Sequence, residues 1–377
     1  MTTPAFRPEV AGARTIVVKV GSRILTSQDS TTPHTKRVKS LVDSIAALKK
    51  SGVRVLLVSS GAIAHGMKAL DLKKRPGTIP AKQACASIGQ INLMNMYASH
   101  FMKHGILIGQ VLLTWDDLRD KKRYLNLRNT LFHLFDLNAV PIINENDSVG
   151  VDEIRFGEND TLAAQLSLLV QADLFVNLTD VGGLYDADPK TDKHASHIPL
   201  VDGVSPATLK LASGAANEIG VGGMSTKLGA ADMVNRAGLH ALIGDGFHRT
   251  LLEVLSNPDA GTIFLPRDKK IPARHRWIAF TGRPSGIIAV DEGARRAIVE
   301  KGKSLLVAGV RQIVGTFKVG DMVDIRDDKG QTIGRGLVNY SSQDAAAIAG
   351  CNTSDIASRL GQKTFDELIH RDNLVVL

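Results

Sequence analysis

The feature that most constrains the fold is the stretch of residues 139–169, AVPIINENDSVGVDEIRFGENDTLAAQLSLL. An apolar run typical of a buried strand, Val140–Ile143, ends abruptly in the polar cluster Asn144–Asp147. A second cluster, Glu158–Asp160, leads into an apolar segment with the composition of a helix. In an open α/β sheet, ligands bind in the crevice outside the carboxyl ends of the strands, where helix N-termini also present N–H groups. The stretch therefore predicts an α/β fold with a ligand site at these two clusters.

Each acidic residue also has a purely structural interpretation. Asp147 suits a turn, and Asp160 suits the N-cap of a helix. Two Asn-Asp pairs within 15 residues, both at the ends of elements, favour a site over two unrelated turns.

The first 60 residues predict a parallel sheet. A β-branched run, Arg14–Val20, is followed by Gly21-Ser22, and the periodic segment Thr35–Lys50 is followed by a second apolar run, Val53–Val58. This strand–helix–strand order is a βαβ unit. Lys19 near the end of the first strand and Ser60 after the second are then expected at the same edge of the sheet, where Gly21 lets the backbone approach a phosphate.

Two later segments indicate a nucleotide site. The predicted strand Asp173–Leu178 ends in Thr179-Asp180 and a turn-rich loop, and the glycine-rich turn Gly220–Lys227 opens a helix. Glycines, hydroxyls and a lysine in the first turn of a helix suit phosphoryl oxygens. The turn is not a Walker A motif, because GxxxxGK[ST] occurs nowhere in the chain. The alternative is a surface loop with a solvated lysine.

The chain changes character after residue 264. Prolines and charges at 264–272 indicate a linker. Short β-like runs separated by glycines then predict a small barrel, with a helix over Gly293–Lys301. The runs are Arg276–Phe280, Gly286–Val290, Ser304–Val310, Met322–Ile325 and Ile333–Tyr340. Two domains are therefore expected, residues 1–265 and 273–377, which agrees with a length of 377 residues.

Composition excludes several classes of protein. Hydrophobic content of 44% suits a globular core, yet no apolar run approaches the roughly 20 residues of a membrane helix. The N-terminus lacks the pattern of a signal peptide, and Cys85 and Cys351 show no CxxC spacing, so we expect a cytoplasmic protein without a structural zinc site. The net charge of +8 is spread along the chain and fits an enzyme for anionic substrates as well as it fits a nucleic-acid binder.

Several motifs together resemble the glutamate 5-kinase family of amino-acid kinases, over residues 14 to 265. The motifs occur in that family's order: Lys19-Val-Gly-Ser, Ser59-Ser-Gly-Ala, Asn144-Glu-Asn-Asp, Gly157-Glu-Asn-Asp, Leu178-Thr-Asp-Val-Gly-Gly-Leu-Tyr and Gly222-Gly-Met-Ser-Thr-Lys. The resemblance implies an αβα sandwich on a mainly parallel sheet. It also implies ATP-dependent phosphorylation of the glutamate side-chain carboxylate, the first step of proline synthesis, with proline as feedback inhibitor and a dimer or tetramer as the assembly.

The resemblance also assigns roles to residues. Lys19 and Lys227 would contact the ATP phosphates, and Asp160 would hold both lysines in place. Glutamate would be bound by three residues, Ser60, Asp147 and Asn159. The nucleotide site would be lined by Thr179, Asp180, Val221, Gly222, Gly223, Met224, Ser225, Thr226 and Lys227. The chemistry agrees, because an ionised carboxylate needs no general base and two lysines with Mg²⁺ neutralise the phosphoryl oxygens; no protein ligand of that metal is predicted.

The C-terminal part resembles a PUA domain, best marked by Arg276-Trp-Ile-Ala, Leu305-Leu-Val-Ala-Gly-Val and Gly336-Leu-Val-Asn-Tyr-Ser-Ser. PUA domains often bind RNA, so an RNA-binding protein with vestigial kinase motifs is the alternative. An RNA-binding surface is expected to cluster Lys and Arg with aromatics. Residues 271–377 have 15 Lys and Arg against 12 Asp and Glu, and a single Trp, which favours the kinase. A kinase of the same fold with another carboxylate or phosphate acceptor is the closer rival, against which the Asn144-Glu-Asn-Asp motif argues.

Overall fold

The structure is a computed structural model that describes residues 6–26, 35–150, 158–189, 191–213, 223–266, 273–282 and 284–377. Its contacts divide the chain into two compact units. The first unit comprises Met1–Asp117 and Leu125–Lys270, and the second comprises Leu118–Tyr124 and Ile271–Leu377. The domain limits expected from the sequence, 1–265 and 273–377, stay a prediction. The segment Leu118–Tyr124 was not expected in the second unit.

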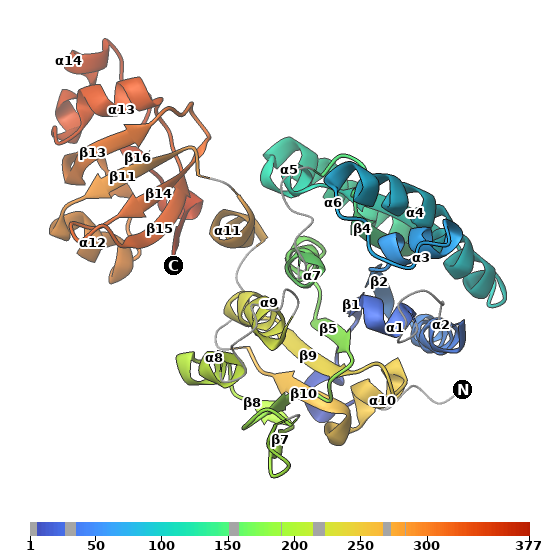
Figure 1. The fold of residues 1–377 in the computed structure, drawn as a ribbon. Helices are drawn as coiled ribbons and strands as arrows, with labels where there is room; N and C mark the ends of the chain where they lie inside the picture. Colours follow the sequence, from blue (N-terminus) through green and yellow to red (C-terminus); the bar gives the residue numbers. More distant parts are fainter. Residues whose placement is uncertain are drawn as a thin grey trace. The chain divides into compact units, whose positions relative to one another are not determined.

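An eight-stranded sheet forms the centre of the first unit (Figure 1). Its strand order is β3-β4-β2-β1-β5-β9-β10-β8, and the pairs are parallel except for β9 with β10. The strands are β1 (Thr15–Val20), β2 (Arg54–Val58), β3 (Ile108–Leu113), β4 (Val140–Glu145), β5 (Leu174–Thr179), β8 (Leu200–Val201), β9 (His240–Asp245) and β10 (Gly261–Phe264). The mainly parallel sheet predicted from the sequence is confirmed.

The central strands are buried on both faces because helices cover each side of the sheet, which is why they read as continuous apolar runs. Ile16, Val18 and Val20 of β1 join the core formed with α2 (Thr35–Lys50). Val17 and Lys19 therefore lie on the opposite face, because side chains alternate along a strand. That face is covered by α7 (Glu158–Leu169) and α9 (Met224–Arg236).

Two further helices pack closely against each other at the end of β2. They are α3 (Ala62–Ala69) and α4 (Ile79–Met102). A Cβ placed on Gly89 would lie 1.8 Å from the carbonyl oxygen of Ala62, and a Cβ on Gly66 would lie 1.8 Å from that of Cys85. Glycine is therefore required at both positions, because the two backbones touch there. Further helices of this unit are α1 (Ser22–Leu25), α8 (Pro206–Ser213) and α10 (Leu251–Ser256). Two more, α5 (Trp115–Arg119) and α6 (Lys121–Asp136), belong to it only in part, because Leu118–Tyr124 is assigned to the second unit.

The second unit contains a five-stranded sheet of order β13-β11-β14-β15-β17. Its strands are β11 (Gly286–Val290), β13 (Val310–Gly315), β14 (Met322–Arg326), β15 (Thr332–Leu337) and β17 (Leu374–Val376), and β12 (Leu305–Leu306) pairs separately with β16 (Glu367–Ile369). The helices include α12 (Glu292–Val299) and α13 (Ser342–Ile348), of which the first was predicted. The smaller β-rich domain is therefore confirmed.

The first predicted strand of this unit is wrong. Residues 276–280 belong to the end of α11 (Ala273–Arg276) and to a π-helical turn, Trp277–Thr281. The indole Nε1 of Trp277 donates to the carbonyl oxygen of Leu118 at 3.4 Å, and its ring lies 6.1 Å from that of Tyr124. Both contacts join residues far apart in the sequence, so the alternation of residue types does not reveal them. No helix among the described residues is both long and apolar enough to cross a membrane.

Candidate active site

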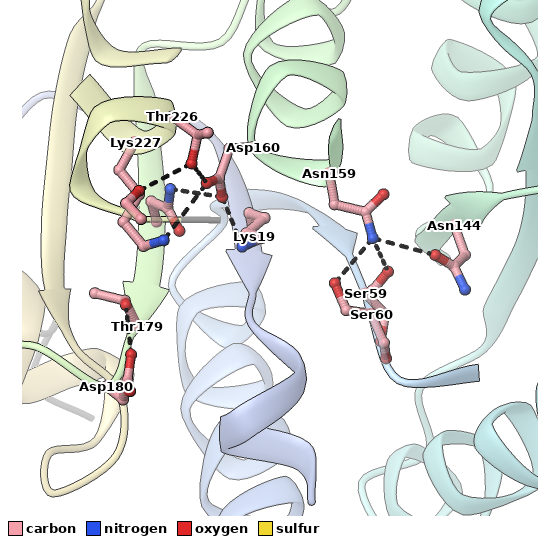
Figure 2. A network of polar contacts seen from close by, with 12 residues as sticks. Lys19, Ser59, Ser60, Asn144, Asn159, Asp160, Thr179, Asp180, Thr226 and Lys227 are labelled. Atoms are coloured by element: carbon pink, nitrogen blue, oxygen red, sulfur yellow. Dashed lines mark hydrogen bonds and ion pairs between the residues drawn. The ribbon is translucent and has the colours of Figure 1, made fainter. Parts of the chain in front are cut away.

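A buried carboxylate with two ammonium groups forms the centre of the site (Figure 2). Nζ of Lys19 lies 2.6 Å from Oδ1 of Asp160, and Nζ of Lys227 lies 3.5 Å from Oδ2. The three side chains come from β1, the first turn of α7 and the first turn of α9. Asp160 is 1% exposed and each lysine is 7% exposed. The sequence placed these residues in one site, and the fold brings them into contact.

The strand register explains why Lys19 meets Asp160. Lys19 of β1 stands beside Asn177 of β5, and both side chains lie on the face covered by α7. The amide Nδ2 of Asn177 donates to Oδ1 of Asp160 at 3.0 Å. Thr226 donates its hydroxyl to Oδ2 of the same carboxylate at 2.8 Å. Both oxygens of the carboxylate are thus held from two sides, which fixes its orientation.

Burial and charge act against each other on these groups. Burial alone would raise the pKa of Asp160, but the charges of Lys19 and Lys227 and the hydrogen bonds from Lys19 and Thr226 outweigh it, so the pKa lies below its ordinary value. Burial lowers the pKa of Lys227 although Asp160 opposes that change. The cluster carries two positive groups against one negative group, so it favours an additional anion.

The N-terminus of α9 adds to this positive field. Its N-cap, Gly223, makes no side-chain hydrogen bond to the first turn, and that turn contains no acidic residue. Met224, Ser225 and Thr226 form the turn with Lys227. Uncapped N–H groups at the positive end of a helix suit phosphate oxygens. Val221 and Gly222, which the sequence assigned to the same site, lie outside the described residues.

The end of β5 places two further predicted residues near α1. The hydroxyl of Thr179 donates to Oδ1 of Asp180 at 3.1 Å, and the guanidinium of Arg23 donates to Oδ2 at 2.7 Å. Burial would raise the pKa of Asp180, but the bond from Arg23 and other hydrogen bonds lower it below its ordinary value. Asp180 is therefore an ionised group at the carboxyl edge of the sheet.

A second network lies on the other side of α7. The amide Nδ2 of Asn159 donates to the hydroxyl of Ser60 at 2.8 Å and to the carbonyl oxygen of Ser59 at 3.1 Å, with Oδ1 of Asn144 at 3.4 Å (Figure 2). Ser60 is followed by Gly61, whose φ of +101° turns the chain into α3. Oδ1 of Asn159 is buried and accepts no hydrogen bond from any described residue. An N–H or ammonium group of a ligand would satisfy it.

Asp147 lies in the turn after β4, a few residues from Asn144. Burial raises its pKa to about 6, although the charge of Arg75 opposes the shift. A carboxylate with a raised pKa gains from a positively charged ligand, which restores the ionised form. Of the predicted glutamate-binding residues, Ser60 thus follows the end of β2, Asp147 follows the end of β4, and Asn159 lies in the first turn of α7.

Sequence reasoning missed several polar partners of these residues. Asn177 was visible as a polar residue inside an otherwise apolar strand. Arg23 follows the Gly21-Ser22 turn that was expected near phosphate. Tyr97 and Gln90 of α4 also contact the second network, although no role in the site was expected for residues of that helix. Their seven-residue spacing was a usable signal, because it places both on one face of a helix.

The amino acid kinase family model matches residues 14–245, and the PUA domain model matches residues 286–360. The chain therefore belongs to the amino acid kinase family, with a PUA domain after the kinase region. Its relatives over nearly the whole length are named glutamate 5-kinase. The one from Moorella thermoacetica is 44% identical and covers 100% of both chains. The one from Caldanaerobacter subterraneus subsp. tengcongensis is 46% identical over 96% of this chain and 97% of its own. The one from Syntrophus aciditrophicus is 44% identical over 96% and 94%.

Proposed function

We propose that this chain transfers the terminal phosphoryl group of ATP to the side-chain carboxylate of glutamate. The observation that carries the proposal is the position of two neighbouring residues at the start of α7. Asp160 faces Lys19 and Lys227, whereas Asn159 faces Ser59 and Ser60 (Figure 2). The helix start thus separates a positively charged half, suited to phosphates, from a polar half, suited to an amino acid.

The positively charged half binds the phosphoryl donor, ATP, and is called the donor half below. In it, Lys19 and Lys227 bind the phosphate oxygens and stabilise the charge that develops on the transferring group. Asp160 keeps both ammonium groups in place through its ion pairs at 2.6 and 3.5 Å. The first turn of α9, from Gly223 to Thr226, adds N–H groups without side-chain caps. Thr179 and Asp180, with Val221 and Gly222, complete the nucleotide site in this proposal.

The polar half binds the phosphoryl acceptor, glutamate, and is called the acceptor half below. In it, Asp147 pairs with the α-ammonium group of glutamate. Ser60 and Asn159 orient the substrate beside it. Oδ1 of Asn159, which accepts no hydrogen bond within the described part of the chain, supports an acceptor that carries an N–H donor, because a plain dicarboxylate offers none. An amino acid with a second carboxylate has an ammonium group for these contacts and a side-chain carboxylate to accept the phosphoryl group.

No general base is needed for this reaction. The side-chain carboxylate of glutamate is ionised at neutral pH, since its ordinary pKa is about 4.3. Catalysis then consists of aligning two anions and neutralising their charge, which is the usual strategy of phosphoryl transfer. The raised pKa of Asp147 concerns binding of the ammonium group rather than removal of a proton.

Mg²⁺ is proposed to enter with the nucleotide. Among the described residues, no three His, Cys, Asp or Glu side chains are grouped to hold a metal ion. Mg²⁺ commonly keeps several waters and binds through substrate phosphates with few protein ligands. It would supply charge neutralisation at the phosphates, beside the two lysines.

The wider role follows from the same activity. We propose that the product enters proline synthesis as its first intermediate, that proline inhibits the enzyme by feedback, and that the protein acts in the cytoplasm as a homo-oligomer. The names of the relatives support the activity. The test is ADP release by purified protein with ATP, Mg²⁺ and a panel of amino acids. Glutamate should support turnover and aspartate should not, and equal turnover with both would refute the assignment.

A further inference from the structure

One face of α4 contacts residues at and after the ends of β2 and β4, beside the acceptor half of the site. Nε2 of Gln83 donates to the carbonyl oxygen of Gly150 at 3.0 Å, and Oε1 of Gln90 accepts from Nδ2 of Asn144 at 3.0 Å. The hydroxyl of Tyr97 lies 3.0 Å from that of Ser59. Residues 83, 90 and 97 are seven positions apart, so they lie on one face of the helix. This face therefore reaches the ends of both β2 and β4.

The contact between Tyr97 and Ser59 has a defined direction. The Ser59 hydroxyl donates to the carbonyl oxygen of Ser60 at 3.1 Å, and a hydroxyl has only one hydrogen to give. With that hydrogen directed to Ser60, the phenol of Tyr97 donates to Ser59. Burial raises the pKa of Tyr97, so its phenol keeps its hydrogen over the working pH range. A chain of hydroxyls thus runs from α4 to the peptide that follows Ser60.

The position of Ser60 affects the acceptor half of the site. Ser60 presents its hydroxyl to Asn159, and the carbonyl oxygen of Ser59 accepts from the same amide. Gly61 follows in the left-handed region and is the N-cap of α3. Ser60 carries both the carbonyl oxygen that accepts from Ser59 and the hydroxyl that accepts from Asn159, so a shift of the Ser60 backbone would move that hydroxyl relative to Asn159.

Packing alone does not explain a tyrosine at position 97. The neighbours of Tyr97 in its core include Leu93 and Phe101, all fully buried. A phenylalanine would fill the same space without the cost of burying a hydroxyl group. The hydrogen bond to Ser59 offsets that cost.

We infer that Tyr97 is a positioning residue for the amino-acid acceptor, acting through Ser59 on the Ser60 hydroxyl. The inference rests on the proposed function, because it assigns Ser60 and Asn159 to the glutamate half of the site. It concerns a residue that touches neither substrate. Its effect should therefore appear in acceptor binding and not in nucleotide binding.

The test is Tyr97→Phe in the full-length protein, with KM for glutamate and KM for ATP measured separately. Loss of one buried neutral hydrogen bond predicts a rise of about 2- to 10-fold in KM for glutamate. KM for ATP should change less than about 2-fold. Ser59→Ala should raise KM for glutamate similarly, and the double variant should be no worse than the poorer single variant, since both remove one interaction.

Tyr340→Phe is the matched control. Its buried hydroxyl bonds to the backbone of Phe365 in the second unit, so its loss should lower the unfolding temperature and leave both KM values unchanged. Equal rises of both KM values in Tyr97→Phe, or an unchanged KM for glutamate, would overturn the inference. Neither result would affect the proposed function, which wild-type turnover with glutamate would still support. Wild-type protein without glutamate-dependent turnover would overturn both.

Discussion

Nζ of Lys19 lies 2.6 Å from Oδ1 of Asp160, and the lysine is only 7% exposed. Removing two such charges from water is costly, and an ion pair alone seldom repays that cost. The pair is better explained by what it holds in place than by the stability that it adds. A fixed ammonium group at the carboxyl end of β1 is ready for an anion before the anion arrives.

The two lysines should therefore contribute mainly to the transition state. Lys19→Ala and Lys227→Ala are each expected to lower kcat by about 10²–10³-fold, the usual loss when one charge stabiliser is removed. KM for glutamate should change far less. Steady-state kinetics at saturating ATP gives both values, with circular dichroism to confirm folding.

Lys73→Ala is the control, because Lys73 is exposed and pairs with the exposed Asp71. It should retain full activity. Near-normal kcat in either Lys19→Ala or Lys227→Ala would remove that lysine from the mechanism.

Glutamate use should depend on pH through Asp147. With its pKa raised to about 6, the carboxyl is neutral below that pH and loses its attraction for an ammonium group. Binding is thus present above about pH 6 and is lost as pH falls. We expect kcat/KM for glutamate, measured at saturating ATP, to fall towards tenfold per pH unit between pH 6 and 5.

Asp147→Asn provides the control for that profile. It should raise KM for glutamate much more than KM for ATP and leave kcat/KM nearly independent of pH between 5 and 7. A variant that keeps the wild-type pH profile would show that another group titrates. Equal effects on both KM values would make Asp147 a structural turn residue.

The sequence predicted most of the kinase fold because its signals are local. The strand–helix–strand order near the N-terminus needs only periodicity and short turns, and the helix Thr35–Lys50 has the predicted limits. Lys19 and Asp160, 141 positions apart, could be brought together only by motif resemblance. Their actual contact depends on the register of β1 with β5, which no local pattern encodes.

What the sequence did not predict was determined by long-range packing. Trp277 was expected in a strand, yet its indole bonds to Leu118, which precedes it by 159 residues. Tyr97 is a buried residue of α4, and no role was expected for it, because a single hydroxyl hardly alters hydrophobic periodicity. In both cases the deciding partner lies far along the chain, so a window of neighbouring residues cannot reveal it.

The close contact of α3 and α4 should couple stability to glutamate binding. In Gly89→Ala the new Cβ would lie 1.8 Å from the carbonyl oxygen of Ala62, so the helices must separate. We expect a loss of roughly 1–3 kcal/mol in the free energy of unfolding, as for other overpacked cores. KM for glutamate should rise, because α3 begins directly after Ser60 and Gly61.

Gly77→Ala is the matched control, because nothing lies within 4 Å of a Cβ at that position. Denaturant unfolding and steady-state kinetics of both variants test the prediction. Gly89→Ala with wild-type stability would show that the two helices can adjust at no cost.

Removal of the C-terminal domain should leave the kinase active, because every residue assigned a chemical role lies at or before Lys227. We expect chain 1–266 to turn over and to differ in its response to proline, its Mg²⁺ requirement or its assembly state. The contacts of Trp277 bear on where the chain should be cut. Trp277 contacts Leu118 and Tyr124, so a cut at 266 removes a partner of that segment, whereas a cut after Gly282 keeps it.

Chains 1–266, 1–282 and 1–377 should therefore be compared for turnover, proline inhibition, size in solution and unfolding temperature. Chain 1–282 is expected to be the more stable of the two truncated forms. Folded truncated chains without turnover would show that the C-terminal domain completes the active site.

The proposed reaction is tested most directly by trapping its product. An acyl phosphate on the glutamate side chain reacts with hydroxylamine to give a hydroxamate, whereas ATP hydrolysis gives none. With ATP, Mg²⁺, glutamate and hydroxylamine, we predict one glutamyl hydroxamate per ADP released, and no hydroxamate when aspartate replaces glutamate. ADP release without hydroxamate, or equal hydroxamate from both amino acids, would contradict the assignment of glutamate as the phosphoryl acceptor.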